Sequence, residues 1–258
     1  TAWYADIILP ASAHAEKNGT FTNTNRQVQM GRKVVNPPGE AKQDLEIIND
    51  LGKALGLEWS YNHASEVFNE MSKVMPSLNN ISWERVDAED SVTYPCDDKN
   101  LPGNEIVFSQ NFPTSSGLAK IVPTDLISPH ELPDQNFPFV LTTGRLLEHW
   151  HTGAMTRRSN TLDNIEPEAI VNMNRLDMKN LKLEPGNKVQ VKTRRGSIEL
   201  SVRQDTELPK GMIFIPFCFS EAAANKLTNP QLDPFGKIPE FKYCAANIEA
   251  VSYTHLRA

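Results

Sequence analysis

The residues best suited to chemistry are concentrated in one polar stretch, residues 142–159, which reads TTGRLLEHWHTGAMTRRS. An apolar run precedes this stretch, and Gly144 within it permits close approach of a ligand to the backbone. Arg145 offers a planar fork of donors for a phosphate or a polar heterocycle. Further donors and acceptors, a flat indole and positive charge follow at His149, Trp150, His151, Thr152, Arg157 and Arg158. This combination predicts a large, polar, phosphorylated ring as the ligand.

The same stretch does not match the common nucleotide and metal motifs. It has neither the G-x-G-x-x-G nor the Walker spacing. His149 and His151 could bind a metal ion, but no third candidate ligand is nearby. From spacing alone, three interpretations of the two histidines stay open: contact with a ligand, a structural pair, and metal ligation.

The elements around this stretch are predicted to be short strands. The hairpin of residues 188–193 and 197–203 alternates cleanly between apolar and polar positions, with Gly196 in its turn. A short helix is expected over residues 175–181. Other strands are expected at residues 139–142, 170–173 and 212–217. Many short strands with few helices predict a small closed barrel.

The amino-terminal part of the sequence has a different pattern, with a helical periodicity in place of many short strands. Residues 5–10 form an apolar run stopped by a proline, which indicates a buried strand, and the polar residues 16–30 are expected to form a loop. Residues 42–55 have the pattern of an amphipathic helix, and Gly56 stands where a carboxyl-terminal cap belongs. This order is typical of the end of an α/β domain. A second short helix is expected over residues 64–75.

Periodicity fades between residues 76 and 135, where Pro, Asn, Asp and Ser dominate. This region is expected to be an irregular connecting segment with short strands. Its aromatic residues indicate that it packs on something rather than being disordered: Trp83, Tyr94, Phe108 and Phe112.

Composition limits the possible functions. The net charge of −6 argues against a general nucleic-acid binder, and no apolar run is long enough to predict a transmembrane segment. Cys96, Cys218 and Cys244 are too far apart for a disulfide framework or for a zinc or iron–sulfur spacing. A cytoplasmic setting is the default expectation, with the periplasm left open.

Both ends of the chain are unusual. The first residue is Thr1, and a strand-like run follows almost at once, so the chain is expected to begin inside a domain. Residues 252–258 (SYTHLRA) continue no pattern. They are expected to be a foreign tail, and the alternative is a frayed natural terminus.

Four segments together resemble the molybdopterin oxidoreductases, the group that holds formate dehydrogenases and periplasmic nitrate reductases. The stretch at 142–159 resembles their dinucleotide-binding loop. In the same order as in the family, the other segments read ADIILPASAHAEKNGTFTNTNRQVQ, PPGEAKQDLEII and FCFSEAAANKLTNPQLDPFGKIPEFKYCAANIE. The runs GTFTN and LDPFGKIPEFKYCA look more like formate dehydrogenases than nitrate reductases.

The resemblance implies a molybdenum or tungsten ion held by two molybdopterin guanine dinucleotides (bis-MGD), and a 4Fe-4S cluster. It places the metal ligand, the catalytic residues and the cluster upstream of this chain, so no catalytic residue and no metal ligand is expected here. Cys96 is interpreted as structural, and Cys218 and Cys244 as core residues. The implied substrate is formate, and the implied partners are iron–sulfur or flavin electron-transfer subunits.

The resemblance also assigns roles to individual positions. Asp44 is expected to accept two hydrogen bonds from guanine, or else to complement the dipole of its helix. Lys17 is expected to contact phosphate or pterin, or else to be a solvated lysine. Asn225 and Lys242 match pterin contacts, and Phe217 matches a position near the substrate channel or is ordinary core. One dinucleotide is expected to lie against Thr143, Gly144, Arg145, Leu146, Leu147, Glu148, His149, Trp150, His151 and Thr152.

The resulting prediction is a carboxyl-terminal fragment of a multi-domain enzyme, with an α/β segment and a β-barrel of the double-psi type. Residues 1–58 would complete an α/β domain, residues 59–136 would connect, and residues 137–251 would form the barrel. The predicted function is the cofactor-binding portion of a formate dehydrogenase catalytic subunit. The alternatives are a periplasmic-type nitrate reductase and a non-catalytic cofactor-binding module.

Overall fold

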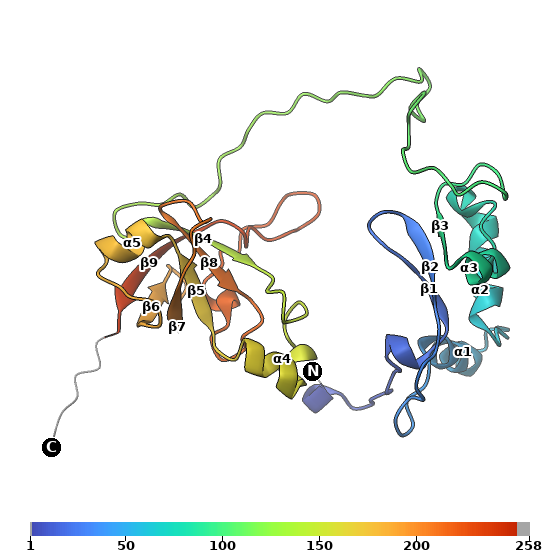
Figure 1. The fold of residues 1–258 in the computed structure, drawn as a ribbon, viewed down its shortest axis with the longest axis horizontal. Coiled ribbons are helices and arrows are strands. Elements are labelled where there is room, and N and C mark those ends of the chain that lie inside the picture. The colour runs from blue at the N-terminus through green and yellow to red at the C-terminus, as the bar shows by residue number, and fades with distance from the viewer. Residues whose placement is uncertain (1, 252–258) are drawn as a thin grey trace. The chain divides into compact units, whose positions relative to one another are not determined.

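The computed structural model describes residues 2–251 and divides into two compact units between Val122 and Pro123. Figure 1 shows both units. The predicted foreign tail, residues 252–258, lies outside the described residues.

The first unit combines a small sheet with three α-helices. Strands β1 (Gly19–Thr22), β2 (Gln27–Gly31) and β3 (Ser91–Thr93) pair antiparallel in the order β1-β2-β3. The helices are α1 (Asp44–Ala54), α2 (Ala64–Val74) and α3 (Trp83–Glu89). Three short 3-10 turns accompany them: η1 (Ala2–Tyr4), η2 (His14–Glu16) and η3 (Pro76–Leu78).

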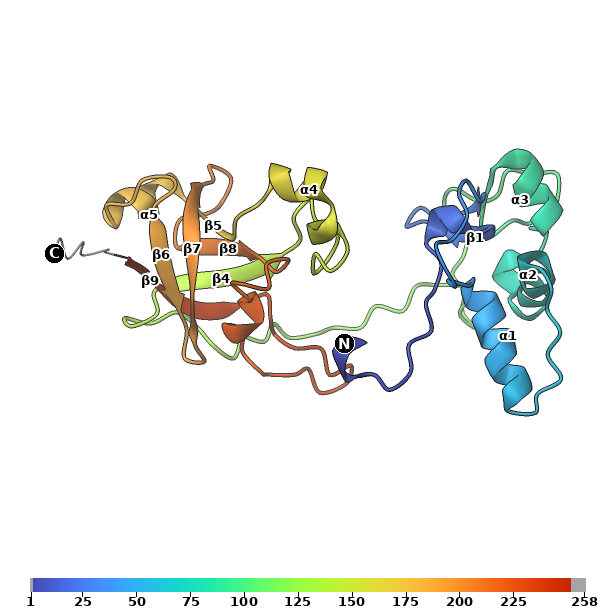
Figure 2. The same cartoon turned by 90° about the horizontal axis from the view of Figure 1, so that it is seen from below.

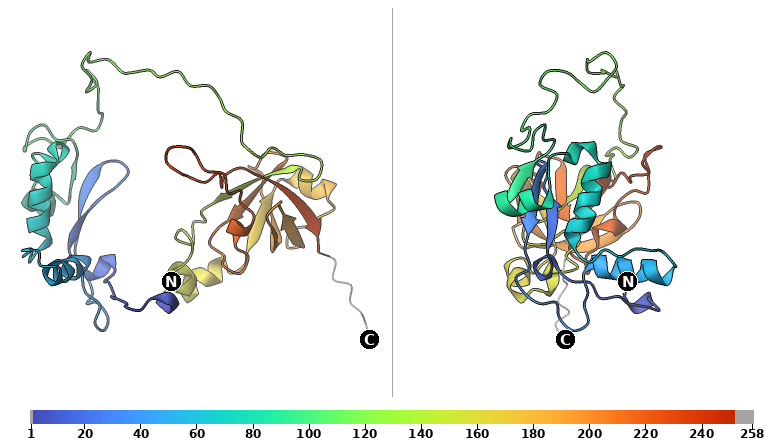
Figure 3. Two further views of the ribbon diagram at one scale, coloured as in Figure 1. Left: turned by 180° about the vertical axis from the view of Figure 1, so that it is seen from behind. Right: turned by 90° about the vertical axis from the view of Figure 1, so that its right-hand side faces the viewer.

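The core of the first unit lies between α2, α3 and the sheet (Figure 3). Helix α3 begins where the Ser82 hydroxyl accepts from the backbone N–H of Arg85, which satisfies one of the unpaired donors of its first turn. The buried residues of this core are Val28, Phe68, Leu78, Ile81, Val86, Val92 and Cys96. Residues 64–96 of the predicted connecting region therefore pack with residues of the predicted α/β segment.

Two expectations for the amino-terminal part were wrong. Residues 5–10 form no strand: within the described chain the nearest bridge joins Ala11 to Lys42, and the run is exposed rather than buried. Residues 16–30 are not a loop, since they contain the β1–β2 hairpin, which pairs Gly19 with Gly31 and Thr22 with Val28. Threonine and glutamine at its solvent-facing positions hide the strand pattern.

Helix α1 is confirmed with slightly shorter bounds than predicted. It begins where the Glu46 carboxylate accepts from the backbone N–H of Gln43, and its carboxyl-terminal end is followed by Gly56, whose φ is +80°. Its predicted apolar face is not buried within this chain, because Ile48 and Leu51 are about half exposed and Leu55 is more so. Helix α2 confirms the second predicted helix.

The second unit is a closed six-stranded barrel, seen in Figure 2. Its strand order is β4-β8-β5-β7-β6-β9, with β9 closing onto β4. The β4–β8 and β5–β7 pairs are parallel and the other four are antiparallel. The strands are β4 (Phe139–Gly144), β5 (Ile170–Met173), β6 (Lys188–Lys192), β7 (Ser197–Gln204), β8 (Met212–Pro216) and β9 (Cys244–Ala250).

The predicted barrel is confirmed, and its core follows the alternation in the sequence. Val189 pairs with Leu200 and Val191 with Ile198, and all four side chains are buried. Outside the barrel wall lie α4 (Asn160–Ile165), α5 (Arg175–Asn180), η4 (Thr156–Arg158) and η5 (Ala224–Lys226). Strand β9 was not assigned from the sequence, because alanines fill its buried positions and give no strand signal.

Candidate functional site

The polar stretch singled out in the sequence leaves the barrel at the end of β4 and returns to it at β5. Gly144 ends β4 against the Phe214 ring, and a Cβ there would lie 2.4 Å from its Cε2 atom. Gly153 has φ of +73°, and a Cβ there would lie 2.7 Å from the Cys218 carbonyl oxygen. Both glycines are therefore needed for packing of the chain on itself, in addition to any approach by a ligand.

Four of the candidate residues come together at the barrel end, although they are far apart in sequence. The Lys242 ammonium donates to the Thr143 carbonyl oxygen at 2.6 Å, and the Thr143 hydroxyl donates to the Phe241 carbonyl oxygen at 2.9 Å. The Phe217 ring lies 5.9 Å from the Lys242 nitrogen and 5.2 Å from the His151 ring. We call Thr143, His151, Phe217 and Lys242 the Thr143 group.

The Thr143 group keeps unused hydrogen-bonding capacity. An ammonium has three N–H donors, and one of those on Lys242 reaches Thr143. The His151 ring is exposed, and among residues 2–251 its nitrogens have no hydrogen-bond partner. The group can therefore donate to an acceptor-rich ligand while Phe217 offers an aromatic face.

His149 has a different environment from His151. Its side chain is buried, its Nε2 atom lies 2.9 Å from the Glu166 carbonyl oxygen, and its ring packs edge-on against Phe219. The Nδ1 atom has no partner in the described part of the chain. A proton on Nε2 satisfies the Glu166 contact. His149 is therefore held inside the protein, whereas the His151 ring is exposed.

The arginines of the loop also divide into paired and unpaired ones. Arg157 is held by Asp163 at 2.5 Å and Glu221 at 3.0 Å, and its guanidinium stacks over Phe219. Its charge is therefore compensated within the protein. The side chains of Arg145 and Arg158 are exposed and have no partner between residues 2 and 251.

The remaining candidates of the second unit lie at the surface. Leu147 is 95% exposed and Trp150 is 69% exposed. Thr152 is exposed, and Leu146 and Glu148 are half-buried. Asn225 lies on η5 with its side chain exposed, and no hydrogen bond among residues 2–251 joins that side chain to the Thr143 group.

The two candidates of the first unit contact one another. The Lys17 ammonium donates to the Asp44 carboxylate in a very short ion pair, and it also lies 3.5 Å from the Ser12 carbonyl oxygen. Asp44 is the first residue of α1. The hydrogen bond from Lys17 holds the pKa of the Asp44 carboxyl below its usual range. Asp44 is therefore an ionised acceptor at neutral pH, as a guanine contact requires.

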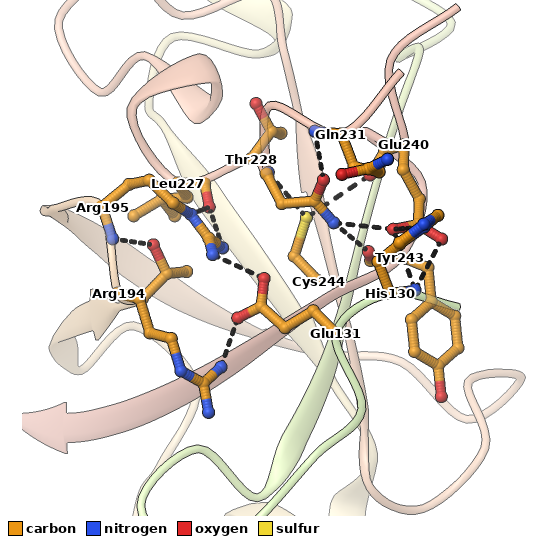
Figure 4. Close-up of polar contacts among 12 residues, drawn as sticks. His130, Glu131, Arg194, Arg195, Leu227, Thr228, Gln231, Glu240, Tyr243 and Cys244 are labelled. Carbon is orange, nitrogen blue, oxygen red and sulfur yellow. Dashed lines mark hydrogen bonds and ion pairs between the residues drawn. The ribbon is translucent and has the colours of Figure 1, made fainter. Parts of the chain in front are cut away.

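Sequence reasoning missed a polar network on the barrel, shown in Figure 4. The Glu131 carboxylate accepts from Arg194 and from Arg195, each at 2.5 Å, and the Arg195 guanidinium also donates to the Leu227 carbonyl oxygen. A surface pocket of about 410 Å³ lies beside this network. The only sequence signal was two adjacent arginines before a turn glycine, which does not identify acidic partners about 60 positions away.

All three cysteines are buried and free of disulfides. Burial raises the pKa of the thiols of Cys218 and Cys244, which disfavours the thiolate that a metal would bind. Within residues 2–251, no group of three or more His, Cys, Asp or Glu side chains could hold a metal ion. None of the helices in this range is long and apolar enough to span a membrane.

Two family models match the chain. The model described as "Molydopterin dinucleotide binding domain" matches residues 139–245, which include the barrel from β4 to the start of β9. The model described as "Molybdopterin oxidoreductase" matches residues 1–54, which include Lys17 and Asp44.

The similar curated proteins are much longer than this chain. The F420-dependent formate dehydrogenase subunit alpha of Methanocaldococcus jannaschii is 46% identical over 97% of this chain, which spans 37% of that protein. The F420-dependent formate dehydrogenase 2 subunit alpha of Methanococcus maripaludis is 40% identical over the same shares. The assimilatory nitrate reductase catalytic subunit of Bacillus subtilis is 34% identical over 96% of the chain and 36% of its own length.

A solved structure has the same fold. The acetylene hydratase from Pelobacter acetylenicus aligns with a TM-score of 0.68 over 94% of this chain and 38% of its own, at 18% identity. That likeness supports the fold alone, because its sequence identity is low.

Proposed function

The chain belongs to the molybdopterin oxidoreductase family, and on that premise we propose that it is the cofactor-holding portion of a formate dehydrogenase catalytic subunit. The observation that carries the proposal is the 46% identity to a formate dehydrogenase alpha subunit over nearly the whole chain. The nitrate reductase relative is less similar, at 34%. The parent enzyme would oxidise formate to carbon dioxide, releasing one proton and two electrons.

The residues present fit a pterin dinucleotide. This cofactor carries a pyrophosphate and ring carbonyl oxygens, which require donors and positive charge. The described loop supplies unpaired donors on Arg145, His151 and Thr152, and Lys242 adds unused N–H groups. Because the side chains of Arg145, His151 and Thr152 are also exposed, these donors are accessible to a ligand.

We assign the candidate residues accordingly. The exposed and half-buried side chains from Arg145 to Thr152 would line one dinucleotide, and Lys242 would reach its pterin side together with Asn225. Asp44 would accept from the guanine of a dinucleotide, and Lys17 would hold that carboxylate in place. Thr143, Gly144 and His149 would support the loop from beneath. Phe217 would lie toward the substrate side.

The cofactor itself supplies the redox chemistry. We propose bis-molybdopterin guanine dinucleotide with molybdenum or tungsten, and a 4Fe-4S cluster in the part of the parent outside this chain. The F420-dependent names of two relatives make an F420-reducing partner subunit the first electron acceptor to test, with NAD as the second. The cytoplasmic location remains a prediction.

The test uses the full-length parent enzyme, purified without oxygen and assayed with a viologen dye. We expect formate to reduce the dye, and reduced dye to remain stable when nitrate is the only oxidant. Nitrate-dependent dye oxidation without formate activity would favour the nitrate reductase. Absence of both activities in cofactor-loaded parent would favour a non-catalytic binding module. Residues 1–258 alone, supplied with cofactor, should not turn over formate.

A further inference from the structure

Asn229 is a buried amide in the loop between η5 and β9. Its Oδ1 atom accepts from the backbone N–H of Gln231 at 2.8 Å. Its Nδ2 atom donates to the Glu240 carboxylate at 2.8 Å and to the Tyr243 carbonyl oxygen at 3.4 Å. Its backbone N–H points to the Cys244 sulfur at 3.2 Å. The Asn229 side chain thus connects Gln231, near the start of the loop, to Glu240 and Tyr243 at its end.

The two residues that Asn229 holds at the end of the loop enclose a functional pair. Glu240 and Tyr243 stand directly before and after Phe241 and Lys242. The Phe241 carbonyl oxygen accepts from the Thr143 hydroxyl, and the Lys242 ammonium donates to the Thr143 carbonyl oxygen. Asn229 therefore forms hydrogen bonds to the residues on both sides of Phe241 and Lys242, and so holds the backbone that places Lys242 against Thr143.

Glu240 also connects the Asn229 contacts to His130, in the segment that precedes β4. Its carboxylate accepts from the backbone N–H of His130 at 3.2 Å, and the His130 ring lies 3.7 Å away. Figure 4 shows His130, Glu240 and Tyr243 on neighbouring segments. Asn229 and His130 together leave the Glu240 carboxylate little freedom to move.

The flexible stem of Lys242 makes such support necessary. A lysine side chain has four rotatable bonds, and one hydrogen bond to Thr143 does not by itself fix the backbone that carries it. We propose that Asn229 is a positioning residue, which holds residues 240–243 so that Lys242 stays on Thr143 at the cofactor-binding face. The cofactor part of this inference rests on the proposed function, whereas the Lys242–Thr143 part does not.

The test is the substitution Asn229→Asp in the full-length parent enzyme. Aspartate keeps the acceptor for Gln231, loses both side-chain donors and sets a second carboxylate against Glu240. Asn174→Asp is the matched control, because Asn174 donates to the Leu208 carbonyl oxygen and accepts from the backbone N–H of Leu176, away from this loop. The double variant Asn229→Asp with Glu240→Gln reverses donor and acceptor, so the glutamine can donate to the new aspartate and still accept from His130.

The first measurement is the rate at which acetic anhydride modifies Lys242, relative to exposed Lys182, in parent enzyme made without the cofactor. We expect this ratio to rise several-fold in Asn229→Asp, to stay unchanged in Asn174→Asp, and to return toward wild type in the double variant. A general loss of stability would raise the modification of both lysines together. An unchanged ratio in Asn229→Asp overturns the proposal, as does a rise that the double variant does not reverse.

The second measurement is pterin dinucleotide content per protein after expression with the cofactor. We expect a several-fold lower content in Asn229→Asp than in Asn174→Asp. Equal content in these two variants, in a wild type that is loaded, overturns the role toward the cofactor. If the wild type itself holds no dinucleotide, the proposed function fails, and the Lys242 ratio still decides whether Asn229 positions Lys242.

Discussion

Lys17 donates to the carboxylate of Asp44 across 27 positions of sequence, and this ion pair brings together two residues that were each expected to contact the cofactor. Lys17 engages Oδ2, which leaves Oδ1 and the remaining lone pairs for a ligand. The pair therefore fits a guanine contact, in which a fixed carboxylate accepts two N–H groups. In this arrangement Lys17 affects guanine binding indirectly, by holding the Asp44 carboxylate in place.

Asp44→Asn in the parent enzyme should lower guanine nucleotide content. The amide turns one acceptor into a donor, which would face a guanine N–H or the Lys17 ammonium. The expected cost is about 1–3 kcal/mol in dinucleotide affinity. The measurement is guanine nucleotide and metal content per protein. Asp50→Asn is the control, because Asp50 lies on the same helix and pairs with Lys42 at 2.9 Å. Equal content in both variants, with a small drop in Tm, would leave Asp44 as a residue that only complements the helix dipole.

The same ion pair predicts a pH dependence. Because the pKa of Asp44 is lowered in the folded chain, its contribution to stability is present above the ordinary aspartate pKa of about 3.9. It is lost as the pH falls through the folded pKa. Asp44 is about half exposed, so solvent screening limits the contribution to about 0.2–1 kcal/mol. Urea unfolding of wild type and Asp44→Asn should differ at neutral pH and converge on acidification. A difference that stays constant into acid would contradict this.

Much of the barrel could be predicted because apolar and polar residues alternate along strands such as β6 and β7, which bury one face. The alternation predicted that Val189 and Leu200 share one face of the hairpin, and the structure pairs them directly. Strand β9 was missed, since small residues such as Ala245 and Ala246 fill the closely packed interior without a strand signal. The β1–β2 hairpin was missed because its strands are short and polar residues such as Thr22 and Gln29 stand among its few apolar ones.

The candidate site was predictable where it is contiguous and not where it depends on distant partners. His149 and His151 look equivalent in sequence, yet one is buried and the other exposed. The reversal of the chain at His151, whose φ is +50°, helps separate them, and this backbone conformation has no signal in a histidine. The contact of Lys242 with Thr143 spans 99 positions, so it appears only once the barrel closes.

Gly153→Ala should destabilise the protein more than Gly186→Ala. Both glycines have positive φ, so both substitutions carry the backbone cost of about 1–2 kcal/mol. At Gly186 an added Cβ meets nothing within 4 Å, whereas at Gly153 it meets the Cys218 carbonyl oxygen at 2.7 Å. We expect an additional 1–3 kcal/mol or so at Gly153, as for overpacking. Urea unfolding measures both values, and equal costs would show that the loop shifts freely around residue 153.

Glu131→Gln should weaken the attachment of residues 130–134 to the barrel. The Glu131 side chain is 11% exposed and accepts from both Arg194 and Arg195. A glutamine can accept from one of them, and its amide would then present N–H donors to the other guanidinium. The expected cost is about 1–3 kcal/mol, because the largely buried carboxylate loses its charge and one of its two charge-assisted hydrogen bonds.

The control for Glu131→Gln is Glu249→Gln, which breaks the exposed ion pair with Lys192 on the same barrel. This control should cost less than about 1 kcal/mol, since exposed pairs are screened by solvent. The measurement is urea unfolding at low and high salt. We expect the cost at Glu131 to persist at high salt, because the buried carboxylate is shielded from ions. If the two variants lose the same stability and salt removes both losses, Glu131 is an ordinary surface charge, and residues 130–134 are held by other contacts.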